Sequence, residues 1–131
     1  MACLDTDILI GFLRRDPEAT SFIEALETQD VPLTTTMTTA CEIFEGAFSS
    51  SHTEQALDSA RSLLNQFIIL PQTRESAETF GRIAAELQKT GQTIGDFDAS
   101  IASIALTHQE ILVTRNTKHF QRIKELKIQS W

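Results

Sequence analysis

Short apolar runs alternate with longer amphipathic stretches along this chain, and this alternation constrains the fold more than any other feature of the sequence. Runs of strand length separated by helix-length patterns are typical of parallel strands joined by crossover helices. The sequence therefore predicts an α/β fold with three α/β/α layers around a mostly parallel central sheet of about five strands. The expected strands lie at residues 1–5, 31–36, 67–70, 111–114 and, more weakly, 127–129.

The amphipathic stretches carry the boundary signals of helices. Asp16 can cap a helix that begins at Pro17, since a capping carboxylate followed by proline is a common helix start. Gly91 follows a helix expected over residues 74–89, as glycine often does at a helix C-terminus. The other helices are expected around residues 6–13, 37–48, 57–64 and 98–106, with a polar hinge at 49–52.

Size and composition indicate one globular domain over residues 1–131. Of the 131 residues, 41% are hydrophobic and 22% are charged, which suits a single core. Cys3 and Cys41 lack the spacing of a zinc site or a disulfide framework, so we expect two reduced, buried thiols. Asp5 interrupts any signal-peptide-like run, and no apolar stretch reaches membrane-spanning length, so we expect a cytoplasmic protein without membrane contact.

The net charge of −7 argues against nucleic-acid binding over the whole surface, because neutralising phosphates requires Lys and Arg. The basic residues are unevenly distributed, however, and five of the eleven lie between residues 115 and 127. This segment is either a local contact for phosphates or a solvated helix face. Its basic residues are Arg115, Lys118, Arg122, Lys124 and Lys127.

Acidic and amide side chains lie close to the ends of the expected strands. Asp5 ends the first strand, Asn116 follows the fourth, and Asp96 and Asp98 open the helix before the fourth. Glu42 lies early in the helix after the second strand. Because ligands bind beyond the carboxyl ends of the strands in open α/β sheets, we expect these side chains to converge on one crevice.

Several carboxylates in one crevice raise one another's pKa unless a cation neutralises them. Oxygen ligands of this kind suit hard cations such as Mg²⁺ and Mn²⁺. An ion held in this way can activate water and stabilise the charge of a phosphodiester during in-line attack. The cluster therefore indicates metal-dependent chemistry that needs no nucleophilic Ser, Cys or His.

Each acid also has a purely structural interpretation. Asp96 could cap the helix that follows it, and Asp98 could complement the dipole of that helix. Glu42 could be a solvated helix residue, whereas Asp5 at the end of an apolar strand is harder to explain in this way. We expect five other polar residues at the surface or, for the two acids, behind the site: Asp7, Glu45, His52, His108 and His119.

Four segments resemble the motifs of PIN-domain nucleases, in the same order and at family-like spacing. Residues 4–9 (LDTDIL) resemble the opening motif, in which the first Asp is a metal ligand. Residues 39–46 (TACEIFEG) are similar to the second motif, and residues 94–102 (IGDFDASIA) to the third, whose Asp immediately before the apolar helix is a ligand. Residues 112–120 (LVTRNTKHF) resemble the fourth motif as it occurs in VapC-type toxins. The resemblance covers the chain from residue 4 to residue 131.

The resemblance implies a PIN-like fold and a Mg²⁺- or Mn²⁺-dependent endoribonuclease, the toxin of a VapBC-like toxin–antitoxin pair. It further implies a homodimer that a VapB-like antitoxin holds inactive, with the antitoxin tail blocking the acidic pocket, often through a basic side chain. The RNA substrate would then meet the bound metal and the basic segment, where Arg115, Lys118 and Arg122 are the expected contacts.

The resemblance also assigns roles to individual residues of the cluster. Asp5, Glu42 and Asp98 are the implied catalytic residues and metal ligands, with the Glu in contact with the metal directly or through water. Asp96 is an additional acid that could assist them. Thr6 and Asn116 are expected to support this group.

Two positions depart from the family pattern and keep alternatives open. Asn116 stands where many PIN nucleases have Asp, so a second metal site could be weak or absent, and Asp7 stands where Asn is more usual. An inactive PIN fold that only binds partners is therefore an alternative. A phosphatase that uses Asp5 as its nucleophile is a weaker one, because Leu9 occupies the place of an expected Thr or Val. A receiver-like domain would need an acid after strand 67–70, where the sequence has Pro71-Gln72.

Overall fold

Five short strands form one sheet in the order β3-β2-β1-β4-β5, and every neighbouring pair is parallel. The computed structural model describes all residues from Met1 to Trp131. The predicted parallel sheet of about five strands is therefore confirmed. The strands are β1 Ala2–Leu4, β2 Leu33–Thr36, β3 Ile68–Leu70, β4 Ile111–Val113 and β5 Ile128–Gln129.

Seven helices connect these strands: α1 Thr6–Leu13, α2 Pro17–Thr28, α3 Met37–Phe48, α4 Thr53–Leu64, α5 Arg74–Lys89, α6 Asp96–Thr107 and α7 Thr117–Phe120. The predicted start of α2 is confirmed, because Asp16 accepts a hydrogen bond from the amide of Ala19 at 3.0 Å. The predicted end of α5 is confirmed as well, since Gly91 follows its C-cap with a φ of +68°, a conformation that glycine adopts without strain.

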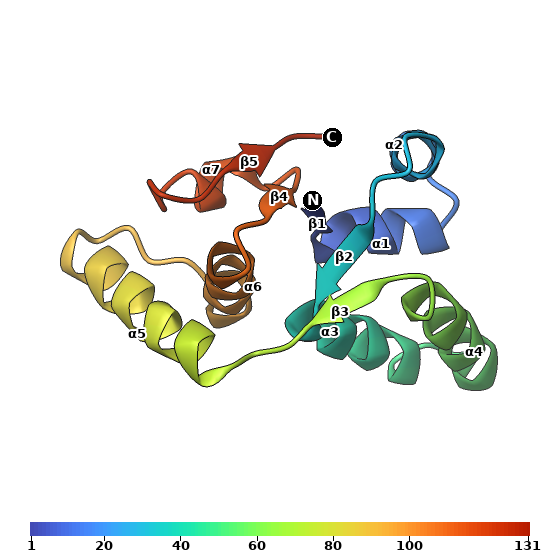
Figure 1. Ribbon diagram of the computed structural model, residues 1–131. Coiled ribbons are helices and arrows are strands. Elements are labelled where there is room, and N and C mark those ends of the chain that lie inside the picture. Colours follow the sequence, from blue (N-terminus) through green and yellow to red (C-terminus); the bar gives the residue numbers. More distant parts are fainter.

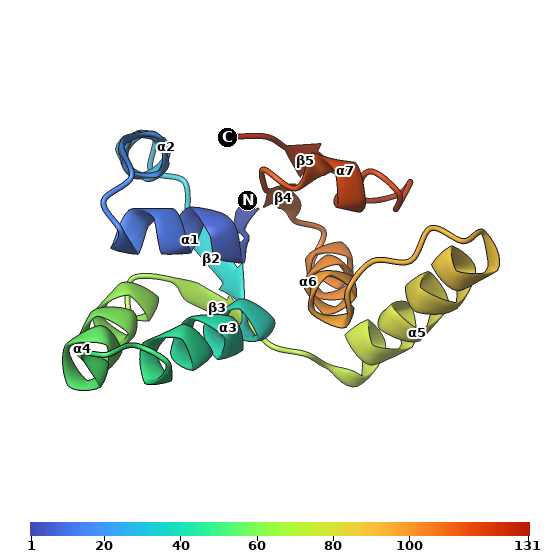
Figure 2. The same ribbon diagram turned by 180° about the vertical axis from the view of Figure 1, so that it is seen from behind.

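The sheet separates two apolar cores, because successive strand residues point to opposite faces. Ala2 and Leu4 of β1 pack with residues of α1 to α4, whereas Cys3 between them packs with residues of α5 and α6. In β4, Val113 belongs to the first core and Leu112 to the second. Figures 1 and 2 show α5 and α6 on one side of the sheet and α1, α3 and α4 on the other, which confirms the predicted layers.

The central strand β1 is the point from which the sheet grows in two directions. The chain adds β2 and β3 on one side of β1 and then returns to add β4 and β5 on the other. The carboxyl ends of β1 and β4 therefore meet at a topological switch point, where ligands bind in open α/β sheets. Asp5 directly follows β1 and Thr114 directly follows β4.

The expected burial of Cys41 is wrong, and one of the two interpretations of the basic segment, a single helix face, is excluded. Cys3 is buried, which raises the pKa of its thiol to about 12, but Cys41 is exposed. The basic segment is not one helix, because only Thr117–Phe120 is helical between residues 115 and 127. Phe48 at the end of α3 is 66% exposed. No helix of the structure combines the length and the apolar character that crossing a membrane requires.

Candidate active site

Asp5 is held by two elements from distant parts of the chain. It is 4% exposed, and one carboxylate oxygen caps α1 by accepting a hydrogen bond from the amide of Ile8 at 3.4 Å. The other oxygen accepts a hydrogen bond from the hydroxyl of Thr114, which in turn accepts from the amide of Asn116 at 2.9 Å. The residues after β1 and β4 thus meet as the switch point requires.

A row of buried hydroxyl groups holds Glu42 in α3. Thr6 Oγ1 donates to Glu42 Oε1 at 2.7 Å, so its 3.1 Å contact with Thr39 Oγ1 makes Thr39 the donor of that pair. Thr36 Oγ1 donates to Thr39 Oγ1 at 3.2 Å and accepts from the amide of Thr39 at 3.0 Å. Every hydroxyl in this row therefore donates toward Glu42. The row of Thr36, Thr39 and Thr6 is called the threonine relay below.

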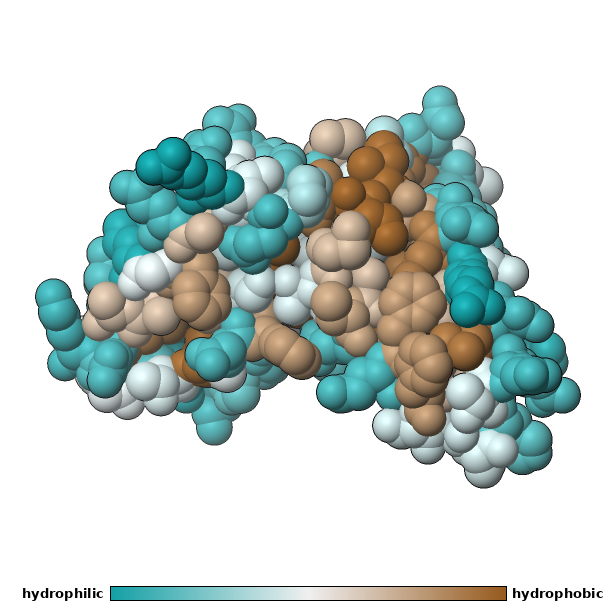
Figure 3. Space-filling model, turned by 90° about the horizontal axis from the view of Figure 1, so that it is seen from below, coloured by the Kyte–Doolittle hydropathy of each residue, from teal (hydrophilic) through white to brown (hydrophobic).

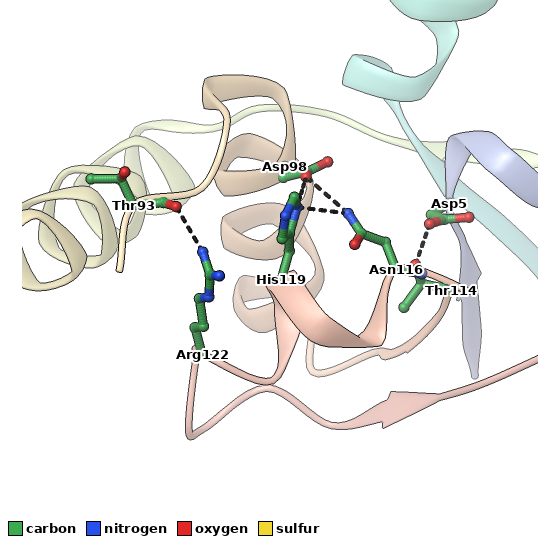
Figure 4. A network of polar contacts seen from close by, with 7 residues as sticks. All are labelled: Asp5, Thr93, Asp98, Thr114, Asn116, His119 and Arg122. Carbon is green, nitrogen blue, oxygen red and sulfur yellow. Dashed lines mark hydrogen bonds and ion pairs between the residues drawn. The ribbon is translucent and has the colours of Figure 1, made fainter. Parts of the chain in front are cut away.

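Asp98 lies in the first turn of α6 and faces the loop before α7 (Figure 4). Its Oδ2 atom accepts a hydrogen bond from Asn116 Nδ2 at 3.2 Å and lies 3.4 Å from His119 Nδ1. Asn116 Nδ2 and His119 Nδ1 are 3.0 Å apart, so the three side chains form one connected group. The side chains of Asp98 and His119 are 29% and 42% exposed, which leaves this group open to solvent.

The site therefore has two halves of different character. The inner half consists of Asp5, Thr114, Glu42 and the threonine relay, all at the ends of β1, β2 and β4 or directly after them in α1 and α3. The outer half consists of Asp98, Asn116 and His119 on α6 and at the start of α7.

Burial changes the acidity of the two inner carboxyl groups. Burial raises the pKa of Asp5 from 3.8 to about 7, and the charge of Asp7 adds to the rise, whereas the hydrogen bonds from Thr114 and Ile8 oppose it. Burial also raises the pKa of Glu42, and its hydrogen bond from Thr6 opposes this. Three neighbouring carboxylates raise the pKa of Glu42 further: Asp98, Asp7 and Glu45. The inner and outer halves are thus close enough to influence each other's charge.

The donor chemistry of the site fits a hard divalent cation. Its carboxylate and amide oxygens are the ligands that Mg²⁺ and Mn²⁺ prefer, and a cation would relieve the cost of keeping Asp5 and Glu42 ionised. No three His, Cys, Asp or Glu side chains are arranged so that they enclose an ion by themselves. A cation at this site would therefore keep part of its water shell, as Mg²⁺ does when one or two carboxylates bind it.

Asp96, the additional acid of the sequence analysis, lies apart from this group. The capping interpretation is wrong, because the N-cap of α6 is Gly95 and no side chain caps this helix. Asp96 is exposed and lines a shallow pocket together with Met37 and Phe97. It makes no hydrogen bond to Asp98 or to the other residues of the two halves.

The basic residues expected to contact RNA differ in their surroundings. Arg122 turns away from Asp98 and donates to the carbonyl of Thr93 at 2.9 Å, as Figure 4 shows. Arg115 pairs with Glu18. Lys118 is exposed and makes no ion pair or hydrogen bond, so it is the one of the three whose charge is free for a ligand.

The histidines and the threonines are what the sequence analysis missed. His119 is half-buried beside Asp98, and His108 is half-buried with its ring nitrogen 2.9 Å from the carbonyl of Ile104, so only His52 is exposed as expected. The spacing of three residues between Asn116 and His119 was a usable signal, because residues three apart lie on one face of a helical turn. Nothing in the spacing of the threonines indicated the relay.

Comparison with known proteins identifies the family of this chain. The chain matches the PIN domain over residues 2–126. It is 33% identical over 131 residues to a ribonuclease VapC1 of Haemophilus influenzae, with 98% of this chain and 96% of the relative covered. It is 30% identical, with the same coverage, to a tRNA(fMet)-specific endonuclease VapC of Shigella flexneri. Its fold matches a chain in the crystal structure of VapBC2 from Rickettsia felis bound to a promoter DNA fragment, with a TM-score of 0.91, 25% identity and coverage of 99% and 98%.

Proposed function

The chain belongs to the PIN-domain family, and from this premise we propose that it is a metal-dependent endoribonuclease, the toxin of a VapBC-like pair. One observation carries the proposal: three separate elements bring Asp5, Glu42 and Asp98 to one edge of the sheet, where the charge of Asp98 raises the pKa of Glu42. The relatives that are named ribonucleases and endonucleases support the same activity. Membership of this family also excludes the phosphatase and receiver interpretations.

Mg²⁺ or Mn²⁺ would be held by Asp5 and Asp98, with Glu42 in contact directly or through water. When bound, the cation activates water and stabilises the charge that develops on the phosphodiester. Asp96 would not hold the cation directly, because it makes no hydrogen bond to these three residues and lines a separate pocket with Met37 and Phe97.

The side chains of the site prepare the carboxylates for this role. Thr6 fixes one oxygen of Glu42, which leaves the other oxygen to accept a proton from the attacking water. The raised pKa of Glu42 makes it a better base than an exposed Glu, since a base works best when its pKa lies near the working pH. Asn116 donates to Asp98 and so keeps that carboxylate turned toward the crevice.

RNA is the proposed substrate, and Lys118 is the best-placed contact for its phosphates. This lysine lies next to His119 in α7 and has no partner within the chain. Arg122 can add a contact only by releasing the carbonyl of Thr93. Cellular RNA is found in the cytoplasm, and we expect the protein to act there.

A VapB-like antitoxin is the proposed inhibitor, and a groove beside Glu42 suits its binding segment. The groove is a cavity of about 600 Å³ between α1, α3 and α4. An apolar helix or strand of the antitoxin would fill it, and a basic side chain at one end would meet Glu42. The solved VapBC structures of similar fold support a VapB-like partner for this chain. The apolar residues of the lining are Ile10, Leu13, Ile43, Ala47, Ala56 and Ala60.

A homodimer is proposed through an apolar surface on α3 and α6. Met37 and Phe97 are 46% and 49% exposed, although large exposed apolar patches are unusual on monomers. Figure 3 shows hydrophobic residues gathered near the middle of the face that lies below in Figure 1, with hydrophilic residues toward its outer edges. Light scattering should report a dimer for the natural chain and a monomer for Phe97→Glu.

The proposed activity is tested by RNA cleavage with the isolated chain. The substrates are initiator tRNA, elongator tRNA and a structured messenger fragment, each with Mg²⁺, with Mn²⁺ and with EDTA. Asp98→Asn is the matched variant, because it removes one charge and keeps the shape of a side chain that is 29% exposed, so we expect the fold to be retained. We expect cleavage that requires the metal and is lost in the variant.

Cleavage that persists in EDTA or in Asp98→Asn would contradict the proposed site. The absence of cleavage on every RNA, together with the absence of Mn²⁺ binding, would favour the inactive PIN fold that only binds partners.

A further inference from the structure

Three consecutive residues after β4 join the two halves of the site. Thr114 donates to Asp5 in the inner half, and Asn116 donates to Asp98 in the outer half at 3.2 Å. The amide of Asn116 also donates to the hydroxyl of Thr114 at 2.9 Å, which ties the ends of this short loop together. The loop therefore contacts both the Asp5 and the Asp98 carboxylates.

The middle residue of the loop, Arg115, is held outside the site by two groups. The Cζ atom of its guanidinium lies 3.7 Å from the centroid of the Trp131 ring. Its Nη2 atom lies 2.5 Å from a carboxylate oxygen of Glu18 in α2, and its Nε donates to the carbonyl of Trp131 at 3.4 Å. These three residues, Glu18, Arg115 and Trp131, are called the arginine clasp.

Trp131 is seated against the first core and is not a loose surface group. It packs against the core cluster formed by α1 to α4, and its ring lies 3.6 Å from the place where a Cβ on Gly11 would stand. The indole N–H is buried and has no hydrogen-bond partner. Burying an N–H without a partner costs free energy, so the packing of the ring must offset that cost and hold the ring in place. The ring therefore presents a fixed aromatic face to Arg115.

The two contacts of Arg115 contribute unequally. The carboxylate of Glu18 is 74% exposed and the side chain of Arg115 is 45% exposed, so solvent screens their ion pair. The stacking of a planar guanidinium on an indole face is less screened and also restricts the orientation of the guanidinium. Trp131 is therefore the main anchor and Glu18 the weaker one.

We propose that Arg115 is a positioning residue for the proposed metal site: the arginine clasp holds the loop from Thr114 to Asn116 and thereby fixes the separation of Asp5 and Asp98. The inference rests on the proposed function for its catalytic consequence. It replaces the role of RNA contact that the sequence analysis gave to Arg115, because the guanidinium is already bound to Glu18 and Trp131.

The experiment compares four variants of the full chain: Trp131→Ala, Trp131→Phe, Arg115→Gln and Glu18→Gln. Arg61→Gln is the matched control, since Arg61 also forms an exposed ion pair, with Asp58 at 3.7 Å, but on α4 away from the loop. Lys118→Gln shows how a true phosphate contact behaves. The measurements are Mn²⁺ affinity by electron paramagnetic resonance, RNA affinity with Ca²⁺ in place of Mg²⁺, kcat and KM, and the side-chain amide resonance of Asn116 without metal.

Positioning predicts that Trp131→Ala and Arg115→Gln shift the Asn116 resonance and weaken Mn²⁺ binding roughly tenfold, as losses behind metal ligands do. We expect kcat to fall by a similar factor while RNA affinity and its salt dependence stay unchanged. Trp131→Phe should retain most of the Mn²⁺ affinity and kcat that Trp131→Ala loses, because it keeps an aromatic face. Glu18→Gln should change these two quantities least. Lys118→Gln should instead weaken RNA binding and leave the Asn116 resonance in place.

A double variant separates the clasp from two independent losses. Arg115→Gln combined with Trp131→Ala should weaken Mn²⁺ binding no more than the stronger of the two single changes, because both remove the same contact between the guanidinium and the indole ring. An unmoved Asn116 resonance in Trp131→Ala, or a loss of RNA affinity in Arg115→Gln that matches Lys118→Gln, would overturn the inference. A natural chain that neither binds Mn²⁺ nor cleaves RNA would contradict the proposed function instead, and the Asn116 resonance would still decide the clasp.

Discussion

The inner and outer halves of the site hold their carboxylates by opposite means. In the inner half, Asp5 is 4% exposed and receives its hydrogen bonds from a backbone amide and a short β-branched side chain. In the outer half, Asp98 is 29% exposed and contacts the longer side chains of Asn116 and His119. The inner half holds its carboxyl groups rigidly, but ionising them costs free energy because they are buried. The outer half is more exposed to solvent and less strictly oriented.

This difference indicates how the two halves share the work of binding a cation. A buried, pre-oriented carboxylate gains the most when a cation arrives, since that charge replaces lost hydration. An exposed carboxylate can adjust to the ion and exchange it. Substitutions in the inner half should therefore change stability and activity together, whereas those in the outer half should change activity with little effect on stability.

The largest effect is expected for Asp5→Asn. Activity should fall about 100-fold or more, because a metal ligand is lost. Without metal, however, the variant should be more stable than the natural chain at pH 8 by roughly 1–3 kcal/mol, because a buried charge has been removed.

The pH dependence of that gain follows from the raised pKa of Asp5. Its folded pKa of about 7 lies above its ordinary value of 3.8, so the folded state holds the proton more tightly. The stability that protonated Asp5 contributes to the natural chain should then be fully present below about pH 4 and be lost as the pH rises through about 7. Urea unfolding in EDTA at pH 5.5 and pH 8 measures the effect. Equal differences between the two chains at both pH values would show that burial of Asp5 is not the cause.

A smaller loss is expected for Thr114→Val, which keeps the shape of the side chain and removes its hydroxyl. The amide of Asn116 loses its acceptor and Asp5 loses a donor, which should cost about 1–2 kcal/mol of unfolding free energy. The pKa of Asp5 should rise further, because the Thr114 hydrogen bond now lowers it. Chemical denaturation gives the first quantity and carboxyl-carbon NMR titration the second. Thr114→Ser, which retains the hydroxyl, is the control.

The variant Thr39→Val interrupts the threonine relay and should lower the unfolding free energy by about 1 kcal/mol. It removes the hydroxyl–hydroxyl hydrogen bonds of Thr39 with Thr6 and with Thr36. Thr6 still donates to Glu42, so activity should fall less than in Thr6→Val, in which Glu42 loses its donor directly. Thermal unfolding and RNA cleavage measured side by side test this order. A Thr39→Val chain less active than Thr6→Val would argue against the relay.

The smallest change in stability is expected for His119→Ala in the outer half. The ring is 42% exposed, so the unfolding free energy should change by less than about 0.5 kcal/mol. Mn²⁺ affinity should still fall by roughly threefold to tenfold, because Asp98 loses a neighbour that restricts its orientation. A destabilisation as large as that of Thr114→Val would mean that the outer half is as strictly built as the inner one.

The sequence anticipates the carboxylates of both halves better than the side chains that hold them. Asp5 stands where an apolar strand gives way to a helix, and periodicity alone locates such a boundary. Thr34 to Thr36 indicate a strand, but which hydroxyl points at which partner depends on strand pairing that only the folded sheet defines. His119 carried a local spacing signal, whereas the clasp joins residues about a hundred positions apart and leaves no local pattern. The exposure of Cys41 and Phe48 is equally invisible to helix periodicity.

The threonine relay has one further consequence, which concerns direction. Its first donor is the backbone N–H of Thr39, which belongs to the helix and cannot rotate as a hydroxyl can. Each later hydroxyl must therefore point the same way, and the aligned dipoles end with their positive ends toward Glu42. The main chain thus fixes the direction in which every hydrogen bond of the relay points. Because all of them donate toward Glu42, the relay stabilises the carboxylate form of Glu42 relative to the neutral acid, whatever the pH of the surrounding solution.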